Sequence, residues 1–546
     1  MFASLPPRGR ALVPAAALIV LLAVLLLGSH SRAPVIEAAD PAIGHGGDVL
    51  IVTGRGFGAA RDGGQVLIAG VAPTSSAYLE WSAARISVRV PEEVRSGFVY
   101  VVAGGRRSNG VLFANRDHLP RVGAALADPG QPLVVDVSKR RAAVGDAVVI
   151  TGRNFGSRRG SSAVLFTWLS AGPLAAGEGT AEFVAADAHD FDYENWSDTE
   201  IRVRVPDGAA TGNLLVRTER GSSNQVFFEV GSAVGSKRYT GRRTYSVSMQ
   251  LSITDVRASG PNDLYLWMPK VWQAPAQRNV RLVAREPEPL YEDIAGVAVF
   301  QLRNLVRGDV YDVTQQFIFE RYAVQTDVDE GRVEPYDRAT RAYRTFTSPE
   351  PLIAADDERV VALAERLTRG ELNPWRRARQ LYDGLLRRLV YDARRAADPV
   401  AALAAGSGDA YDFAMLYTAL LRAATVPARP VAGYLVQSPD RLHAHYWTEL
   451  YLHRFGWVPV DPALGSGAGL LPVDPGRDPA AYYFGNLDNR HLTLSKGVVE
   501  TGKLVAHGRT VQRADLGTLQ VHHEEVVGDL ASYTARWSGL TILGVY

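Results

Sequence analysis

The sequence predicts a multidomain protein in which three β-rich domains precede an α+β domain. A chain of 546 residues is too long for a single hydrophobic core, and about three or four domains are expected. In the first half, short alternating apolar runs lie between glycine-rich turns, a pattern typical of β-sandwiches. After about residue 350 the apolar residues recur first at helical and then at strand spacing, which indicates a mixed domain.

Composition excludes several classes of function. The hydrophobic fraction of 47% is that of a globular protein, and the net charge of +1 gives no basic surface for nucleic acid or for an anionic membrane. The chain contains no cysteine. Disulfides, thiolate metal sites and thiol catalysis are therefore excluded together.

The N-terminal segment predicts export. Arg8 and Arg10 precede an apolar run over residues 11–27, the pattern of a secretory signal or of an uncleaved anchor. We therefore assign residues 1–33 to a signal peptide or membrane anchor. The remainder is expected in the periplasm or at the cell surface, and it touches the membrane only through this segment.

One sequence pattern occurs twice. Residues 47–58 recur as residues 145–156, and a Ser-Asn pair, Ser108–Asn109 in the first copy, returns as Ser223–Asn224 in the second. The repeated Thr-Gly-x-x-Phe-Gly motif resembles the IPT/TIG family of immunoglobulin-like domains. The resemblance implies two immunoglobulin-like β-sandwiches, over residues 34–116 and 120–232, that act as spacers or binding modules. The second copy carries an insert near residues 167–190, which we expect to be an extended loop.

The pattern changes twice farther along the chain. Alternation continues through residues 245–251 and 264–268, which predicts a third β-rich domain over residues 238–350. Helical spacing then appears in residues 356–368, and Asn373 with Pro374 provides the N-cap and first turn of a second helix. We place the α+β core at residues 355–495.

Three blocks in this core carry the information on chemistry. They are Gly-Asp-Ala-Tyr-Asp-Phe-Ala at residues 408–414, His-Tyr-Trp-Thr-Glu at 445–449 and Gly-Trp-Val-Pro-Val-Asp-Pro at 456–462. Their order and spacing resemble the core of the transglutaminase-like cysteine enzymes, which have a papain-like fold. The resemblance implies a nucleophilic cysteine at position 410, a base at His445 and an orienting carboxylate at Asp461.

The nucleophile position holds alanine. We expect a helix to begin at Asp409 or Ala410, where the positive field of the helix start would lower the pKa of a thiol. The methyl group of Ala410 cannot attack a carbonyl carbon. Ser407 and Tyr411 lie nearby in sequence, but neither occupies the attack position, and a hydroxyl needs stronger activation than a thiol.

The spacing of His445 and Asp461 predicts that they meet. A five-residue loop over residues 452–456 places Asp461 opposite Trp447 and diagonal to His445. Asp461 would then fix the tautomer of His445 and leave the other imidazole nitrogen facing position 410. The alternative is a satisfied, partly buried histidine retained after the thiol was lost. A metal site made of His443, His445 and Asp461 is disfavoured because cysteines and a helical His-x-x-x-His motif are absent, so no metal or cofactor is predicted.

The C-terminal residues 496–546 are predicted to form a β extension whose last strand completes a sheet. The run His522–Glu525 is interpreted as a solvated segment and not as a set of ligands.

We therefore expect an exported pseudoenzyme whose transglutaminase-like domain binds a peptide, protein or glycan. Two alternatives stay open. One is an active amide hydrolase or acyltransferase that uses a substitute nucleophile or a water molecule activated by His445, and the other is a purely structural spacer of the cell envelope.

Overall fold

The fold is known from a computed structural model that describes residues 33–116, 130–169, 182–232, 234–394, 398–438, 440–471 and 476–546. The chain forms two compact units, residues 1–126 and 127–546. Of the predicted signal peptide or membrane anchor, residues 1–33, only Ala33 lies within the described residues. Among the helices that the structure describes, none is long and apolar enough to cross a membrane. The finer domain boundaries within the two units stay predictions.

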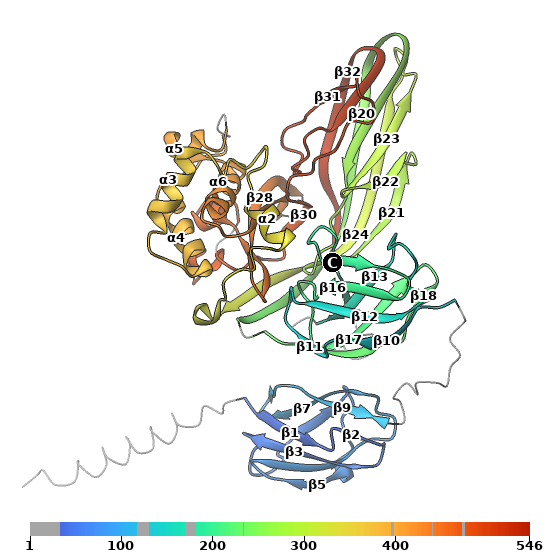
Figure 1. Ribbon diagram of the computed structural model, residues 1–546, viewed down its shortest axis with the longest axis vertical. Coiled ribbons are helices and arrows are strands. Elements are labelled where there is room, and N and C mark those ends of the chain that lie inside the picture. Colours follow the sequence, from blue (N-terminus) through green and yellow to red (C-terminus); the bar gives the residue numbers. More distant parts are fainter. Residues whose placement is uncertain are drawn as a thin grey trace, which may run out of the picture. The chain divides into compact units, whose positions relative to one another are not determined.

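The first unit is a β-sandwich (Figure 1). One sheet has the order β1-β3-β6-β5 and the other β2-β9-β7-β4, with β8 paired to β7. Leu50, Val88 and Phe113 are among the residues that fill the core between the sheets. The elements are β1 (Val35–Asp40), β2 (Ile43–Gly44), β3 (Val49–Arg55), β4 (Gln65–Ile68), η1 (Ser75–Ala77), β5 (Tyr78–Trp81), β6 (Arg85–Arg89), β7 (Gly97–Ala103), β8 (Arg106–Arg107) and β9 (Val111–Asn115).

The second unit begins with a sandwich of the same strand order, which confirms the repeat. Its sheets are β10-β12-β16-β15 and β11-β19-β17-β13-β14, with β18 on β17. The two Ser-Asn pairs also have equivalent roles, because Asn109 Oδ1 accepts from Ile36 N at 2.8 Å and Asn224 Oδ1 from Val134 N at 2.9 Å. The strands are β10 (Leu133–Val137), β11 (Arg141–Ala142), β12 (Ala147–Arg153), β13 (Ala163–Trp168), β14 (Glu182–Ala185), β15 (Tyr193–Trp196), β16 (Glu200–Arg204), β17 (Gly212–Thr218), β18 (Gly221–Ser222) and β19 (Val226–Val230).

The insert of the second sandwich is not all loop. Strand β14 lies within it and pairs with β13, so part of the predicted extended loop widens the sheet instead. Phe183 and Val184 supply the apolar residues that this edge strand needs.

A long sheet follows, and the C-terminus completes it. Strand β20 pairs with β24 and β23, and β32 also pairs with β20 over much of its length, so the last strand closes the sheet as predicted (Figure 1). The elements are β20 (Gly235–Pro269), β21 (Gln277–Glu286), β22 (Tyr291–Ile294), β23 (Val297–Arg303), β24 (Tyr311–Val328), η3 (Glu330–Arg332), β31 (Arg509–Val511) and β32 (Glu524–Val545).

The α+β core places helices beside a four-stranded sheet of order β29-β28-β27-β30 (Figure 1). Helix α6 is buried on all sides, and its Leu416, Leu420 and Leu421 are fully inaccessible. The elements are α2 (Arg341–Thr347), α3 (Glu358–Leu367), α4 (Pro374–Leu386), β25 (Val390–Tyr391), α5 (Ala401–Ala405), β26 (Ser407–Gly408), α6 (Ala410–Ala423), β27 (Ala428–Ser438), β28 (Arg441–Leu452), β29 (Gly456–Val460), α7 (Pro462–Gly465), α8 (Pro479–Tyr482) and β30 (His491–Lys496).

Buried charges join the second sandwich to this core. The Arg429 guanidinium on β27 pairs with Asp190 of the sandwich and with Glu449 on β28, and Lys496 on β30 pairs with the same Glu449 at 2.8 Å. Because each charge has an opposite partner, the buried cluster avoids the penalty of an isolated buried ion. It holds β27, β28 and β30 against the sandwich.

Gly433 permits the close spacing of the three central strands. It pairs with His445 on β28 and with Thr493 on β30, and a Cβ atom at this position would overlap the carbonyl group of Leu492. Backbone atoms cannot yield as a flexible side chain can. We therefore expect Gly433→Ala to lower the free energy of unfolding by about 1–3 kcal/mol or more, measured by urea denaturation.

The matched control is Gly502→Ala, where an added Cβ would meet no atom within 4 Å. Equal stabilities of the two variants would contradict this account of the β27–β30 packing.

Candidate functional site

Helix α6 begins at the position predicted for the nucleophile. Asp409 is the N-cap, and its carboxylate accepts from the backbone N–H of Asp412 at 3.0 Å, while Asp412 Oδ2 accepts from the N–H of Asp409 at 3.0 Å. This reciprocal capping box fixes the first turn. Ala410 is the first helical residue and is 5% exposed. A buried methyl group therefore occupies the start of the helix.

The β28–β29 hairpin has the predicted register. Leu452 pairs with Gly456 and Thr448 pairs with Val460, so the next step places Asp461 opposite Trp447. Asp461 lies immediately after β29 as the N-cap of α7, where its Oδ1 accepts from Leu464 N at 2.9 Å. The cap fixes the carboxylate in one orientation.

His445 and Asp461 are in contact, as their spacing predicted. His445 Nε2 lies 2.6 Å from Asp461 Oδ2, and both side chains are fully buried. The carboxylate can only accept, so Nε2 carries the proton and donates it; this assigns the tautomer from the hydrogen-bond network. The other nitrogen, Nδ1, is buried and has no hydrogen-bond partner among the described residues. In the neutral imidazole this nitrogen is the acceptor.

Two contacts place the start of α6 beside the His445 segment of β28. Thr448 Oγ1 lies 3.1 Å from Thr418 Oγ1 in the middle of the helix. Closer to the helix start, the rings of Tyr411 and Tyr446 meet edge to face with centroids 5.2 Å apart. These contacts pack the Tyr446 and Thr448 side of β28 against α6, whereas the His445 side chain, one residue along the strand, points to the other face of the sheet.

A third residue of the site, His491, was missed by the sequence analysis. Its Nε2 lies 3.0 Å from Asp461 Oδ2, and its Nδ1 lies 3.0 Å from Asp488 Oδ1. His491 begins β30, which pairs with β27, and the side chain is fully buried. The available signal was the spacing of Asp488 and His491, but that spacing does not reveal which strand β30 joins.

Two imidazoles, His445 and His491, and two carboxyl groups, Asp461 and Asp488, are linked by hydrogen bonds in the site. Burial raises the pKa of the Asp461 carboxyl, but the imidazoles of His445 and His491 outweigh it and hold that pKa below its ordinary value. Burial lowers the pKa of His491, yet the carboxylates of Asp488 and Asp461 raise it to about 9. At neutral pH an imidazolium at position 491 therefore donates to two carboxylates, and Asp461 Oδ2 accepts from both histidines.

His445, Asp461 and His491 form the one group among the described residues that could hold a metal ion. The ligand atoms of His445, Asp461 and His491 all lie within 4.8 Å of one another. Two imidazoles and one carboxylate suit a divalent transition metal, and Asp488 would orient His491 from behind. The present separations of 2.6 and 3.0 Å are those of hydrogen bonds, so an ion would have to displace both bridging protons. This set contains His491, whereas the set considered from the sequence contained His443.

His443 lies outside that group. Its Nε2 is buried with no hydrogen-bond partner in the described part of the chain, and its ring centroid lies 5.9 Å from that of His445. Burial, followed by the effects of His445 and Arg441, lowers the pKa of His443 to about 4. His443 is therefore neutral at physiological pH.

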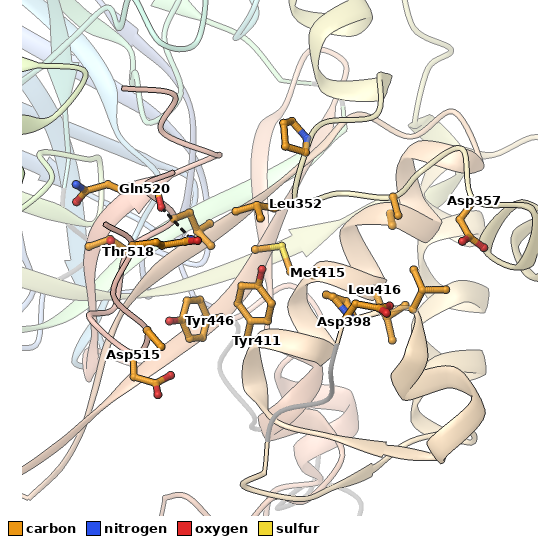
Figure 2. Close-up of a pocket in the computed structure, with 18 of the residues that line it drawn as sticks. Leu352, Asp357, Asp398, Tyr411, Met415, Leu416, Tyr446, Asp515, Thr518 and Gln520 are labelled. Atoms are coloured by element: carbon orange, nitrogen blue, oxygen red, sulfur yellow. Dashed lines mark hydrogen bonds between the residues drawn. The ribbon is translucent and has the colours of Figure 1, made fainter. Parts of the chain in front are cut away.

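A pocket of about 710 Å³ opens beside the site (Figure 2). Tyr411 and Met415 of α6 and Tyr446 of β28 line one side of it, and the segment 512–520 lines another. Figure 2 shows Tyr411, Tyr446 and Met415 grouped between Leu352 and Asp515. Ala410, His445 and Asp461 do not line this pocket, so it adjoins the site through the two tyrosines and does not contain it.

The interpretation of residues 522–525 as solvated was wrong. Glu524 and Glu525 are fully buried, and His522 and His523 nearly so. Glu524 accepts from Arg513 at 2.8 Å, from Tyr533 at 2.6 Å and from Trp537 at 2.8 Å. Strand β32 starts at Glu524 and pairs with β20, and the polar run itself does not reveal these partners, which lie 9 to 13 residues away.

The charge state of His491 makes a prediction about pH. Its pKa of about 9 lies above the ordinary value of 6.5, so its stabilising contribution is complete below pH 6.5 and is lost as the pH rises through 9. We expect the melting temperature to fall over this interval, and to fall less steeply in His491→Gln. Scanning calorimetry between pH 6 and about 10 measures both slopes.

The control for that experiment is His507→Gln, which changes an exposed histidine. This control should keep the pH dependence of the unaltered protein. Parallel slopes for the unaltered protein and His491→Gln would contradict the imidazolium assignment.

Comparisons with known proteins agree with the two resemblances. Residues 361–462 match the family model of the transglutaminase-like superfamily, and residues 34–114 match that of the IPT/TIG domain. No curated protein matches the chain.

Solved structures give weaker similarities. A candidate cysteine protease from Cytophaga hutchinsonii is 15% identical with a TM-score of 0.38, covering 57% of this chain and 93% of its own. The periplasmic domain of TgpA from Pseudomonas aeruginosa is 16% identical with a TM-score of 0.25, covering 44% and 96%. SGBP-B, from a xyloglucan utilization locus in Bacteroides uniformis, is 12% identical with a TM-score of 0.14, covering 54% and 99%.

The motif around Ala410, the His445–Asp461 contact and the family match fall in the same segment. The chain thus contains a transglutaminase-like domain at residues 361–462 and an IPT/TIG domain at residues 34–114.

Proposed function

We propose that this protein is an exported pseudoenzyme whose transglutaminase-like domain binds a peptide, protein or glycan without forming a covalent intermediate. The observation that carries the proposal is Ala410, a methyl group at the helix start where the family resemblance implies a thiol. A covalent acyl intermediate requires a nucleophile at that point.

In the part of the domain that the structure describes, no neighbour of Ala410 supplies a substitute nucleophile. The chain contains no cysteine. Ser407 belongs to the short strand β26, which pairs with β25 and ends before the Asp409 cap. The Tyr411 ring packs against Tyr446, and no hydrogen bond from either hydroxyl to His445 is present among the described residues. Among the described residues, His445 Nδ1 therefore has no thiol or hydroxyl bonded to it that it could deprotonate.

The remaining geometry supports noncovalent binding. A buried nitrogen without a partner, His445 Nδ1, has lost the stabilisation that hydrogen bonding to water gives it in the unfolded chain. An N–H or O–H donor of a ligand would restore that bond. Separately from this nitrogen, the pocket lined by Tyr411 and Tyr446 offers an aromatic and polar surface to a ligand. Export rests on Arg8, Arg10 and the apolar run over residues 11–27.

One observation favours a second candidate, an amide hydrolase without a covalent step. The free Nδ1 of His445, with Asp461 bound to Nε2, is the arrangement that can deprotonate a water molecule. This candidate requires a water molecule and an amide carbonyl to reach a site whose residues are fully buried.

Restoring the thiol tests the main proposal. In Ala410→Cys the new thiol would lie at the start of α6, the position that the family resemblance pairs with the base His445, so we expect a thiolate–imidazolium pair to form. We expect glutamine-directed amine incorporation or amide hydrolysis in Ala410→Cys and none in the unaltered protein. The double variant Ala410→Cys with His445→Ala is the control and should lose at least about 100-fold of the gained rate.

The outcomes distinguish the pseudoenzyme from an active enzyme and from a structural spacer. Activity of the unaltered protein would overturn the pseudoenzyme proposal. No activity of either the unaltered protein or Ala410→Cys, together with no ligand for the unaltered protein, would favour the structural spacer.

The hydrolase candidate makes its own prediction. Any amide hydrolysis by the unaltered protein should fall by about 10²–10⁴-fold in His445→Ala, because the general base is removed. Release of a chromogenic amine from anilide substrates measures it. An unchanged rate in His445→Ala would eliminate this candidate.

A further inference from the structure

A small cavity lies where the second sandwich, the long sheet and the α+β core meet. Its volume is about 30 Å³, whereas a single water molecule needs a volume of only about 10–15 Å³. The cavity therefore has room for one or two particles of about the size of water. The lining residues that matter for its chemistry are three cations, Lys237, Arg321 and Lys496, two carboxylates, Asp207 and Glu449, and the hydroxyl of Tyr239.

Arg321 is a buried cation without a counterion. The residue is 3% exposed, and its Nε has no hydrogen-bond partner. In the part of the chain that the structure describes, no carboxylate lies within ion-pair distance of its guanidinium. Burial lowers the pKa of Arg321 to about 10, so the group is still protonated at neutral pH. Because an isolated buried charge is strongly unfavourable, this guanidinium needs an anion close to it.

The two carboxylates of the lining already have cationic partners. Asp207 pairs with Lys237, and Glu449 pairs with Lys496 at 2.8 Å. Glu449 is also shared with Arg429, which lies outside the lining, at 2.9 Å. These pairs leave one positive charge of the lining without a counterion.

The guanidinium of Arg321 lies on the cavity side of its strand, β24. The charges that act on it are that of Asp488 and then those of groups that include Glu449 and Tyr239, which line the cavity. Asp488 does not line the cavity, and its Oδ1 is bonded to the imidazolium of His491 at 3.0 Å. An anion inside the cavity would be closer to the guanidinium than any of these groups.

The hydroxyl of Tyr239 is a second buried group without a partner. The residue is 4% exposed, and its hydroxyl makes no hydrogen bond to any described residue. The ring is held in place by Trp168, with the ring centroids 5.4 Å apart. A hydroxyl can donate to an anion, and hydrogen bonds to an ionised partner are the strong ones. Both unpartnered groups of the lining therefore favour an anionic ligand.

We propose that this cavity binds one small monovalent anion, a halide such as chloride, through the Arg321 guanidinium and the Tyr239 hydroxyl. The anion would neutralise the excess positive charge of the lining, and the volume of the cavity excludes large polyatomic anions. Strands β20, β24, β28 and β30 all contribute to the lining, so the bound ion would stabilise the junction between them. The site uses neither Ala410 nor His445, and the inference is independent of the proposed function of the transglutaminase-like domain.

Thermal unfolding of the full chain tests the site. The melting temperature is measured as sodium chloride replaces sodium gluconate at constant ionic strength, because gluconate is too large for the cavity. We expect a rise of about 2 °C or more for each tenfold increase in chloride concentration above the Kd, since the ion binds the folded chain only. Sodium bromide should act as sodium chloride does. Arg321→Gln should remove the dependence on chloride.

A second variant and a matched control accompany Arg321→Gln. Tyr239→Phe keeps the ring that packs on Trp168 and removes one donor, so it should weaken the apparent affinity for chloride about 5-fold or more. The control is Arg257→Gln, which removes an exposed cation of β20. This control should keep the chloride dependence of the unaltered protein.

A direct measurement on the unaltered protein does not depend on whether the variants fold. In crystals of the full chain grown in sodium bromide, anomalous scattering should show one bromide ion within hydrogen-bond distance of Arg321 and Tyr239. Absence of this peak, a melting temperature that does not depend on the ratio of chloride to gluconate, or equal chloride dependence in Arg321→Gln and Arg257→Gln would each overturn the proposal.

Discussion

The buried carboxylate of Asp461 is the constraint on which the rest of the site depends. It lies at the end of β29 without access to solvent, and it accepts from His445, from His491 and from the Leu464 backbone. A buried carboxylate is stable only when its oxygens are satisfied by donors. These three donors come from β28, β30 and α7, so the ionised state of one residue requires all of these elements to be assembled.

The sheet provides that assembly through close spacing. Gly433 on β27 lies between His445 on β28 and Thr493 on β30, and the absence of a side chain allows the three backbones to approach. At the other end of the same strands, Glu449 joins Arg429 to Lys496. Two buried polar networks therefore fix the register of the sheet from both ends, where a one-residue slip would reverse every side chain.

Local patterns in the sequence predicted what depends on neighbouring residues. The Asp409 cap, the start of α6 and the His445–Asp461 register all follow from short-range spacing, and all are present. His491 was missed because its role depends on β30 pairing with β27, across more than fifty residues of chain. The burial of Glu524 was missed because the polar run at residues 522–525 does not reveal its partners Tyr533 and Trp537, which lie farther along β32.

The presence of His445 and Asp461 in a domain with Ala410 has a physical explanation that does not need catalysis. Removing one partner of a buried, hydrogen-bonded charge network costs about 3–5 kcal/mol, because the remaining charge keeps its burial and loses its partner. The position of Ala410 carries no such constraint, because a small methyl group fills the space at the helix start and leaves no buried charge unpaired. Alanine in place of cysteine at position 410 therefore changes the free energy of unfolding little, whereas replacing His445 or Asp461 would lower it strongly. The His445–Asp461 pair is therefore explained by its contribution to the stability of the sheet. Whether the domain can form a covalent intermediate depends on the residue at position 410.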